Sequence, residues 1–216
     1  MKSLNSIELI LWDFDGVILD SMHVRDQGFV EIFKDYPQEQ VDDLLTYHRT
    51  NGGLSRYVKI RYFFNEIRNE PISDEQVMAL AAEFSVIMKR ILCDENLLIA
   101  DSCQFIAAHA GDVPMYIVSG SDQTELRYLC EQLSISQHFK GIFGSPTPKT
   151  ELVAAILQEK QPILDKTVLI GDSVNDYEAA SKNQVGFLGY NNPNLKGHGN
   201  QYIESFDQLA IDFKPF

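Results

Sequence analysis

Short apolar runs alternate with helical stretches along most of the chain, and this alternation limits the possible folds more than any other feature. Four runs have the length of short buried strands, namely residues 7–11, 115–118, 168–170 and 186–188. Three intervening stretches have helical patterns, namely residues 124–133, 150–158 and 175–182. Such alternation predicts an α/β protein with a parallel sheet covered by helices on both faces. Ligands of such sheets bind outside the carboxyl ends of the strands.

One long segment, residues 22–92, breaks the alternation because it contains only helical signals. Its clearest helix is predicted over residues 73–91, which begin with capping-box spacing and continue with one apolar stripe. A second helix is predicted over residues 55–68. We therefore expect two domains, a core made of residues 1–21 and 93–216 and an inserted all-helical domain over residues 22–92.

The composition narrows the range of partners. The chain has 18 Lys and Arg against 31 Asp and Glu, a formal charge of −13, which disfavours nucleic acid or an anionic membrane as a partner. No apolar run has the length of a membrane span or signal peptide. The three cysteines match no zinc or redox spacing, which indicates small buried thiols in a reducing cytoplasm. The sequence leaves a monomer and a homodimer open.

Two acids follow the first predicted strand. Asp13 and Asp15 are two residues apart, so their side chains can share one site. Gly16 permits a tight turn and the close approach of an anion to main-chain N–H groups. Two carboxylates this close stay ionised together only beside a cation, which indicates Mg²⁺, a hard ion that takes oxygen ligands. The alternative is a polar turn in which Asp caps a helix.

Later segments carry polar groups at the ends of strands or just after them. Ser119 and Gly120 precede a helix, where a hydroxyl suits a phosphate oxygen. Lys149 begins a helix, where its charge opposes the helix dipole and indicates another role, such as neutralising phosphate. Asp172 and Asp176 flank a helix start and can join one carboxylate cluster. Each segment alone also fits helix capping or a solvated side chain, but the whole set at strand ends indicates one phosphate site.

These segments together resemble the haloacid dehalogenase superfamily of phosphatases. The four family motifs appear in order, as Asp13-Phe-Asp15-Gly, Ser119, Lys149 and Gly171-Asp172-x-x-x-Asp176. The first motif, followed by a helical insert, is similar to the subgroup that contains phosphoglycolate phosphatase and beta-phosphoglucomutase. The resemblance implies a Rossmann-like core with an all-helical cap between the first and second motifs.

The resemblance also implies roles for these residues. Asp13 would be the nucleophile that forms an aspartyl-phosphate, and Asp15 would protonate the leaving alcohol and then activate water. Mg²⁺ would be held by Asp13, Asp172 and the main-chain carbonyl of Asp15, and Asp176 would either ligate it or orient its ligands and Lys149. The oxygens of the transferring phosphoryl group would be held by Ser119, Lys149 and the N–H groups near Gly16 and Gly120.

The predicted cap carries a basic stretch that suits an anionic substrate. Five cations and one acid, Glu66, lie between positions 49 and 68, although some of these cations fit a solvated helix face. The segment from Gly53 to Arg56 resembles the substrate-specificity loop of the capped subgroup. We therefore expect Arg49, Gly53 and Arg56 to bind substrate.

The sequence thus predicts a Mg²⁺-dependent phosphomonoester hydrolase for a small phosphorylated metabolite, either a sugar phosphate or a phosphoglycolate-like acid. The alternatives are a sugar phosphomutase and a catalytically idle binding domain on the same fold. Two departures from the mutases disfavour the first alternative, because Gly52 replaces their Lys and Arg25 replaces their His. A dehalogenase would lack the second Asp of the first motif, which is present as Asp15.

Overall fold

The computed structural model describes residues 5–209 and 212–213 of the chain. Its centre is a six-stranded, all-parallel sheet. The strands, in their order across the sheet, are β4 (Gly141–Ser145), β3 (Met115–Asp122), β2 (Leu9–Trp12), β5 (Thr167–Gly171), β6 (Gly186–Tyr190) and β7 (Gln201–Ile203). A separate two-stranded sheet pairs β1 (Asn5–Ile7) with β8 (Asp212–Phe213).

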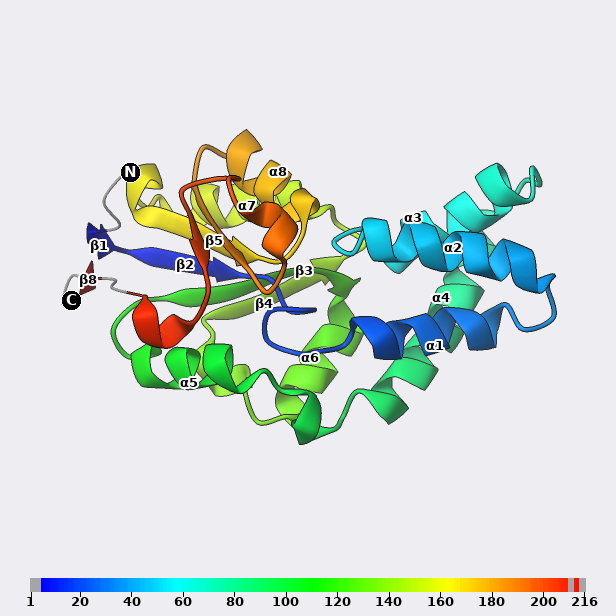
Figure 1. Ribbon diagram of the computed structural model, residues 1–216, viewed down its shortest axis with the longest axis horizontal. Helices are drawn as coiled ribbons and strands as arrows, with labels where there is room; N and C mark the ends of the chain where they lie inside the picture. The colour runs from blue at the N-terminus through cyan, green and yellow to red at the C-terminus, as the bar shows by residue number, and fades with distance from the viewer. Residues whose placement is uncertain (1–4, 210–211, 214–216) are drawn as a thin grey trace.

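Helices cover both faces of the large sheet, as Figure 1 shows. Alternate residues of β2 point into opposite layers, because Ile10 and Trp12 belong to one apolar cluster and Leu9 and Leu11 to the other. The first cluster includes residues of α5 (Ala100–His109) and α6 (Gln123–Gln132). The second includes residues of α7 (Lys149–Lys160) and α8 (Val174–Lys182). The predicted α/β, Rossmann-like fold is therefore confirmed.

The segment after β2 is helical and lies beyond the carboxyl ends of the strands (Figure 1). It contains α1 (Met22–Ile32), α2 (Gln38–Thr50), α3 (Arg56–Tyr62), a π-helix (Phe63–Ile67) and α4 (Asp74–Ile91). α4 begins with the predicted capping box. The helix predicted over residues 55–68 is present as a continuous helical run, in which α3 is followed directly by the π-helix, and periodicity does not distinguish the two kinds of helix.

Within the described part of the chain, five short 3-10 helices connect the larger elements, at Glu95–Leu97, Ser136–His138, Leu164–Lys166, Pro193–Leu195 and Phe206–Gln208. The sequence patterns missed both edge strands of the large sheet, because β7 has only three residues and β4 contains two glycines. The expected strand over residues 7–11 spans parts of β1 and β2. Of the three cysteines, Cys130 is buried and Cys93 is exposed, so the prediction of buried thiols is wrong for Cys93. Among the described residues, no helix is long and apolar enough to cross a membrane.

Candidate active site

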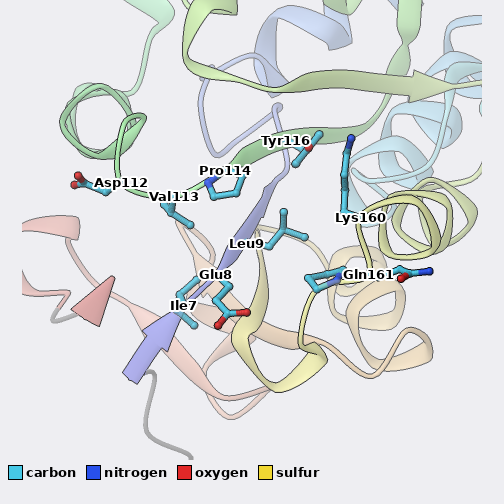
Figure 2. Close-up of a pocket in the computed structure, with 10 residues that line it drawn as sticks. Ile7, Glu8, Leu9, Asp112, Val113, Pro114, Tyr116, Lys160 and Gln161 are labelled. Atoms are coloured by element: carbon cyan, nitrogen blue, oxygen red, sulfur yellow. The ribbon is translucent and has the colours of Figure 1, made fainter. Parts of the chain in front are cut away.

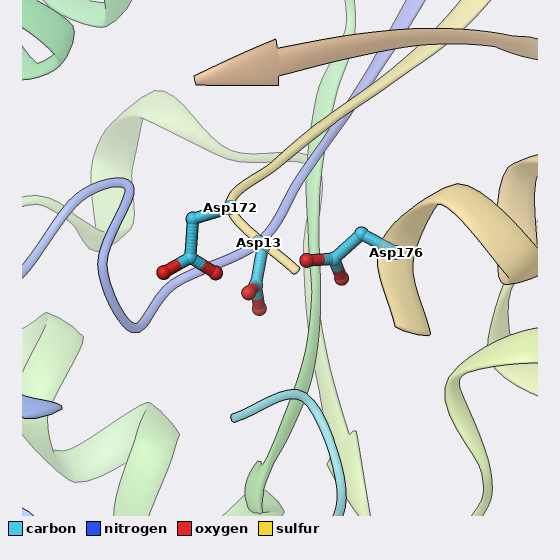
Figure 3. Close-up of side chains that lie close together, drawn as sticks. All are labelled: Asp13, Asp172 and Asp176. Carbon is cyan, nitrogen blue, oxygen red and sulfur yellow. The ribbon is translucent and has the colours of Figure 1, made fainter. Parts of the chain in front are cut away.

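Three aspartates meet at the carboxyl ends of β2 and β5. Asp13 directly follows β2, Asp172 directly follows β5, and Asp176 lies in the first turn of α8. One ligand oxygen from each carboxylate lies within 4.8 Å of the others, and Figure 3 shows Asp13 between the other two. Asp13 and Asp176 are buried, whereas Asp172 is half-buried. Of the four aspartates that the sequence assigned to a metal, the structure brings together the carboxylates of three, Asp13, Asp172 and Asp176.

Lys149 is the cation nearest to this cluster. It is the first residue of α7 and is itself buried, and its Nζ lies 2.7 Å from Asp13 Oδ1 and also donates to Asp176. Burial alone would lower the pKa of Lys149, but Asp13 and Asp176 raise it above its ordinary value, so the side chain is charged. The sequence prediction that this lysine has a role beyond solvation fits its position.

The cluster carries more negative charge than Lys149 can balance. Burial and the neighbouring Asp176 raise the pKa of Asp13 to about 7. Burial, then Asp13 and Asp176, raise the pKa of Asp172 well above its ordinary value. Three buried or half-buried carboxylates beside one lysine form an oxygen-rich site that lacks positive charge. A hard divalent cation such as Mg²⁺ fits such a site.

Asp176 also has a structural role. Its side chain accepts a hydrogen bond from the main-chain N–H of Ser173, and the Ser173 side chain accepts from the N–H of Asp176, which completes a capping box at the start of α8. Asp176 therefore both caps α8 and belongs to the carboxylate cluster. The capping box fixes the Asp176 carboxylate beside Lys149.

The carboxylate of Asp15 is not part of the cluster. Its Oδ1 accepts hydrogen bonds from Ser21 and from Arg25 Nε at 2.6 Å, and its Oδ2 accepts from Ser121 at 2.5 Å. Burial would raise the pKa of Asp15, but Arg25 and these hydrogen bonds lower it below its ordinary value. A metal contact by Asp15 is thus left to its main-chain carbonyl, as the family resemblance implies.

The remaining core residues of the predicted site surround Asp13 and Asp15. Ser119 is buried near the end of β3, and its Oγ accepts a hydrogen bond from the N–H of Ser121. Gly16 has a φ of +77°, and a Cβ there would lie 2.0 Å from Asp172 Oδ2. The alternative of helix capping holds for Asp122, whose side chain accepts from the N–H of Glu125 at the start of α6.

A family model described as haloacid dehalogenase-like hydrolase matches residues 7–183. The chain belongs to this hydrolase family. The predicted superfamily and the prediction of an enzyme are therefore confirmed. A relative from Photobacterium profundum, named phosphoglycolate phosphatase, is 26% identical over 97% of this chain and 96% of its own length. This match confirms the predicted likeness to the phosphoglycolate phosphatase subgroup.

Solved structures show the same fold at lower identity. CbbY from Rhodobacter sphaeroides, in complex with xylulose-(1,5)bisphosphate, has a TM-score of 0.75 and 16% identity, with 96% of this chain and 100% of that chain covered. The beta-phosphoglucomutase from Clostridium difficile has a TM-score of 0.73 and 18% identity, with 94% and 93% covered. The fold of the hydrolase is thus shared with these two proteins.

The helical segment of the hydrolase reaches the core beside Gly120. A Cβ at Gly120 would lie only 2.3 Å from the main-chain oxygen of Gly53, so the loop between α2 and α3 contacts the end of β3. A Cβ at Gly53 would in turn lie 2.7 Å from Ser173 Oγ. Tyr57 on α3 donates a hydrogen bond to Asp122 at 2.7 Å. These contacts place the loop directly over the carboxyl ends of the strands.

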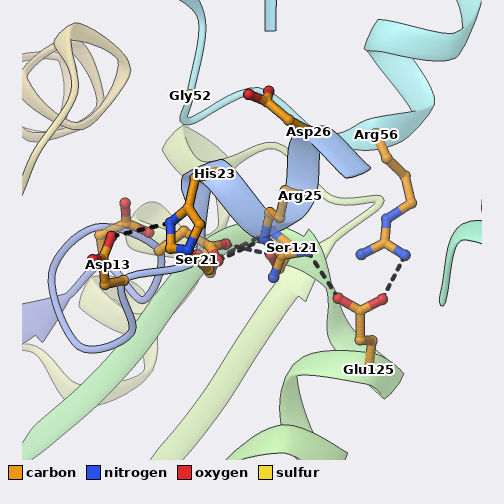
Figure 4. Close-up of polar contacts among 12 residues, drawn as sticks. Asp13, Ser21, His23, Arg25, Asp26, Gly52, Arg56, Ser121 and Glu125 are labelled. Carbon is orange, nitrogen blue, oxygen red and sulfur yellow. Dashed lines mark hydrogen bonds and ion pairs between the residues drawn. The ribbon is translucent and has the colours of Figure 1, made fainter. Parts of the chain in front are cut away.

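A small cavity lies between the helical segment and Asp15. Its volume is about 20 Å³, which is enough for about one water molecule. Three cations line it, namely Arg25, Arg56 and Lys59, and all three are buried. Figure 4 shows Arg25 and Arg56 directed toward one carboxylate, that of Glu125. This cavity is too small for a metabolite, but a larger one of about 210 Å³ lies at the same ends of the strands and is lined by Gly53, Gly120 and Lys149 among others.

Lys59 occupies an unusual environment in this cavity. Its Nζ lies 2.8 Å from His48 Nδ1 and 3.1 Å from the main-chain oxygen of Gly52. Burial and the nearby Arg25 lower the pKa of Lys59 to about 7. Burial and Lys59 also lower the pKa of His48, which keeps that ring neutral. Lys59 therefore carries a charge that depends on pH near neutrality.

Two of the three predicted cap residues lie at the site and one does not. Gly53 and Arg56 have the contacts described above. The Arg49 side chain is 61% exposed and pairs with Asp26 at 2.8 Å, and it is absent from the lining of the cavity. Its position near the specificity segment suggested substrate contact, but α2 directs it toward solvent and α1. The sequence prediction for Arg49 therefore has no structural support.

Two still larger hollows lie near the amino ends of the strands. Figure 2 shows one of about 540 Å³ near the amino ends of β2 and β3, with Glu8, Tyr116 and Lys160 in its lining. It contains none of the three clustered aspartates. Size alone therefore does not identify the active site, and the chemistry lies at the carboxyl ends.

Proposed function

We propose that this protein is a Mg²⁺-dependent phosphatase that hydrolyses phosphomonoesters of a small metabolite through an aspartyl-phosphate. The observation that carries this proposal is Asp13, a buried carboxylate held between Lys149 and two further aspartates at the carboxyl end of β2. In this position Asp13 as a nucleophile lies beside both the fixed ammonium group of Lys149 and an oxygen-rich site for a cation. The names of the curated relatives support the same reaction.

In the proposed first step, an Asp13 oxygen attacks phosphorus, and the ester P–O bond breaks while the Asp13 O–P bond forms. Protonated Asp15 gives its proton to the leaving oxygen. In the second step, water attacks phosphorus, ionised Asp15 takes the proton of that water, and the Asp13 O–P bond breaks. The low pKa of Asp15 favours the ionised form that this second step needs, so the first step uses the minor, protonated form of the same carboxyl.

Asp13, Asp172, Asp176 and the main-chain carbonyl of Asp15 would hold Mg²⁺. When bound, Mg²⁺ would offset the repulsion between Asp13 and an anionic phosphate and stabilise the charge of the transferring group. Lys149 would donate to a phosphoryl oxygen from the other side of Asp13. Ser119 and the N–H groups near Gly16 and Gly120 would hold the remaining oxygens.

Residues 22–92 would act as the cap that closes over the leaving group. The cavity beneath this segment has three buried cations, Arg25, Arg56 and Lys59, and two acids that face them, Asp15 and Glu125. When Lys59 is charged, the three cations exceed the two acids by one, and this excess favours an anionic leaving group, such as the carboxylate of a phosphoglycolate-like acid. A sugar phosphate with a neutral leaving group would not use this excess.

The test is phosphate release from a panel of phosphorylated metabolites, with and without Mg²⁺. We expect Mg²⁺-dependent release by the native protein and none by Asp13→Asn. Asp35→Asn, at an exposed position, is the matched control and should keep full activity. Isomerised sugar phosphates without phosphate release would instead support a mutase, and no reaction with any ester would support an idle binding domain.

A further inference from the structure

Glu125 is a fully buried carboxylate that the sequence patterns did not single out. It lies in the first turn of α6, a helix of the core, and its side chain has no solvent exposure. Its Oε1 accepts from Arg25 Nη1 at 3.0 Å, and its Oε2 accepts from Arg56 Nη1 at 2.6 Å. The two arginines come from α1 and α3. One core carboxylate thus holds two cations of the helical segment side by side (Figure 4).

Other contacts fix the orientation of each guanidinium group. Arg25 Nε donates to Asp15. Arg56 Nη1 also donates to Ser85 at 2.6 Å, and its guanidinium carbon lies 4.6 Å from the centre of the Phe84 ring. After these contacts, the Nη2 atom of each arginine is buried and has no hydrogen-bond partner. A buried guanidinium nitrogen without a partner is costly, so a ligand that accepts from both Nη2 atoms would be favoured.

Both arginines line the small cavity beside Asp15, where the leaving group would lie. A carboxylate has two oxygens with lone pairs and can accept from two guanidinium groups at once. A neutral hydroxyl group offers one oxygen and no charge, and would leave most of this donor capacity unused. Glu125 holds the two arginines together by pairing with one nitrogen of each, and it leaves the Nη2 atom of each without a partner.

We propose that Glu125 is a positioning residue that makes the leaving-group pocket selective for a carboxylate. It acts through Arg25 and Arg56, which would contact the leaving group, and it does not itself contact the substrate. Its negative charge offsets the mutual repulsion of the two arginines. This inference rests on the proposed phosphatase function.

The test compares two esters that differ in the charge of the leaving group, phosphoglycolate and 2-hydroxyethyl phosphate. The native protein should prefer phosphoglycolate in kcat/KM. Glu125→Gln retains the shape but loses the charge and one acceptor, so the ratio of the two kcat/KM values should fall by at least about tenfold, mainly through KM for phosphoglycolate. The values for 2-hydroxyethyl phosphate should change by less than about threefold, because a neutral leaving group makes little use of the two arginines.

Two further variants separate positioning from structure. Glu131→Gln makes the same chemical change at an exposed position of α6 and should leave the ratio unchanged. Glu125→Asp keeps the charge with a shorter reach, so its ratio should lie between those of the native protein and Glu125→Gln. If Glu125→Gln does not fold, the test uses Glu125→Asp instead. In that case an unchanged ratio of the two kcat/KM values in Glu125→Asp would overturn the proposal.

A loss of equal size on both esters would mean that Glu125 is merely structural, and would also overturn the proposal. So would a native protein that hydrolyses both esters without preference, although the phosphatase function would then stand. Release of no phosphate by the native protein from either ester, or from the wider panel, would overturn the phosphatase function and this inference with it.

Discussion

Magnesium should stabilise the folded protein measurably, and Asp172→Asn should remove most of that effect. The reason is the crowding of Asp13, Asp172 and Asp176, whose ligand oxygens lie within 4.8 Å of one another. At this separation two ionised carboxylates repel by roughly 3 kcal/mol at an effective dielectric constant of about 20. Lys149 offsets part of this repulsion, and a divalent cation would offset the rest.

The size of the shift follows from mass action. Mg²⁺ at about a hundredfold excess over its dissociation constant adds about 2.7 kcal/mol to the free energy of unfolding. For a chain of this length each kcal/mol raises Tm by about 2–4 °C, so the shift should be about 5–10 °C. Without Mg²⁺, at a pH above the raised pKa values of Asp13 and Asp172, Asp172→Asn should melt above the native protein, because the variant has one fewer repelling carboxylate.

The assay is thermal unfolding followed by circular dichroism, in EDTA and in saturating Mg²⁺. Native protein and the surface control Asp35→Asn should show the same Mg²⁺-dependent shift, and Asp172→Asn should show less than half of it. A native Tm that does not respond to Mg²⁺ would refute the metal site. An unchanged shift in Asp172→Asn would refute the assignment of Asp172 as a ligand.

Two further predictions concern the cap. Gly120→Ala puts a Cβ 2.3 Å from the main-chain oxygen of Gly53, so it should hinder closure of the cap and lower kcat/KM by roughly tenfold to a hundredfold. Gly111→Ala is the control, because a Cβ there meets nothing within 4 Å. It should have no effect in the same steady-state assay. Lys59 has its pKa lowered to about 7, so it is charged below that pH and neutral above it. KM for phosphoglycolate should therefore rise by roughly tenfold as the pH passes upward through 7, and this rise should vanish in Lys59→Met. A profile that is the same in both proteins would contradict the role of Lys59.

The core of the site could be predicted from the sequence because the carboxyl ends of parallel strands lie along the same side of the sheet. Asp13, Ser119 and Asp172 each lie at or just after the carboxyl end of a predicted strand, and the topology of the sheet makes β2 the neighbour of both β3 and β5. Local patterns locate strand ends well enough for this purpose. The order of the strands did not need to be known.

The cap could not be predicted in the same way. Glu125 and Arg25 are 100 positions apart, and no local pattern indicates that a helix of the core would meet α1. Arg49 and Arg56 lie in the same basic stretch, yet one points to solvent and the other is buried. Their difference depends on how α2 and α3 pack, which the spacing of charges does not encode. The direction of the Asp15 carboxylate depends likewise on the distant Ser121.

The central claim is that Asp13 becomes covalently phosphorylated during turnover. The most direct measurement is an acid quench of the protein within a single turnover of phosphoglycolate and Mg²⁺, followed by peptide mass spectrometry. We predict a phosphoryl group on the peptide that contains Asp13, which appears and then decays as phosphate is released. Release of phosphate without any phosphorylated peptide, or continued release by Asp13→Asn, would contradict the account.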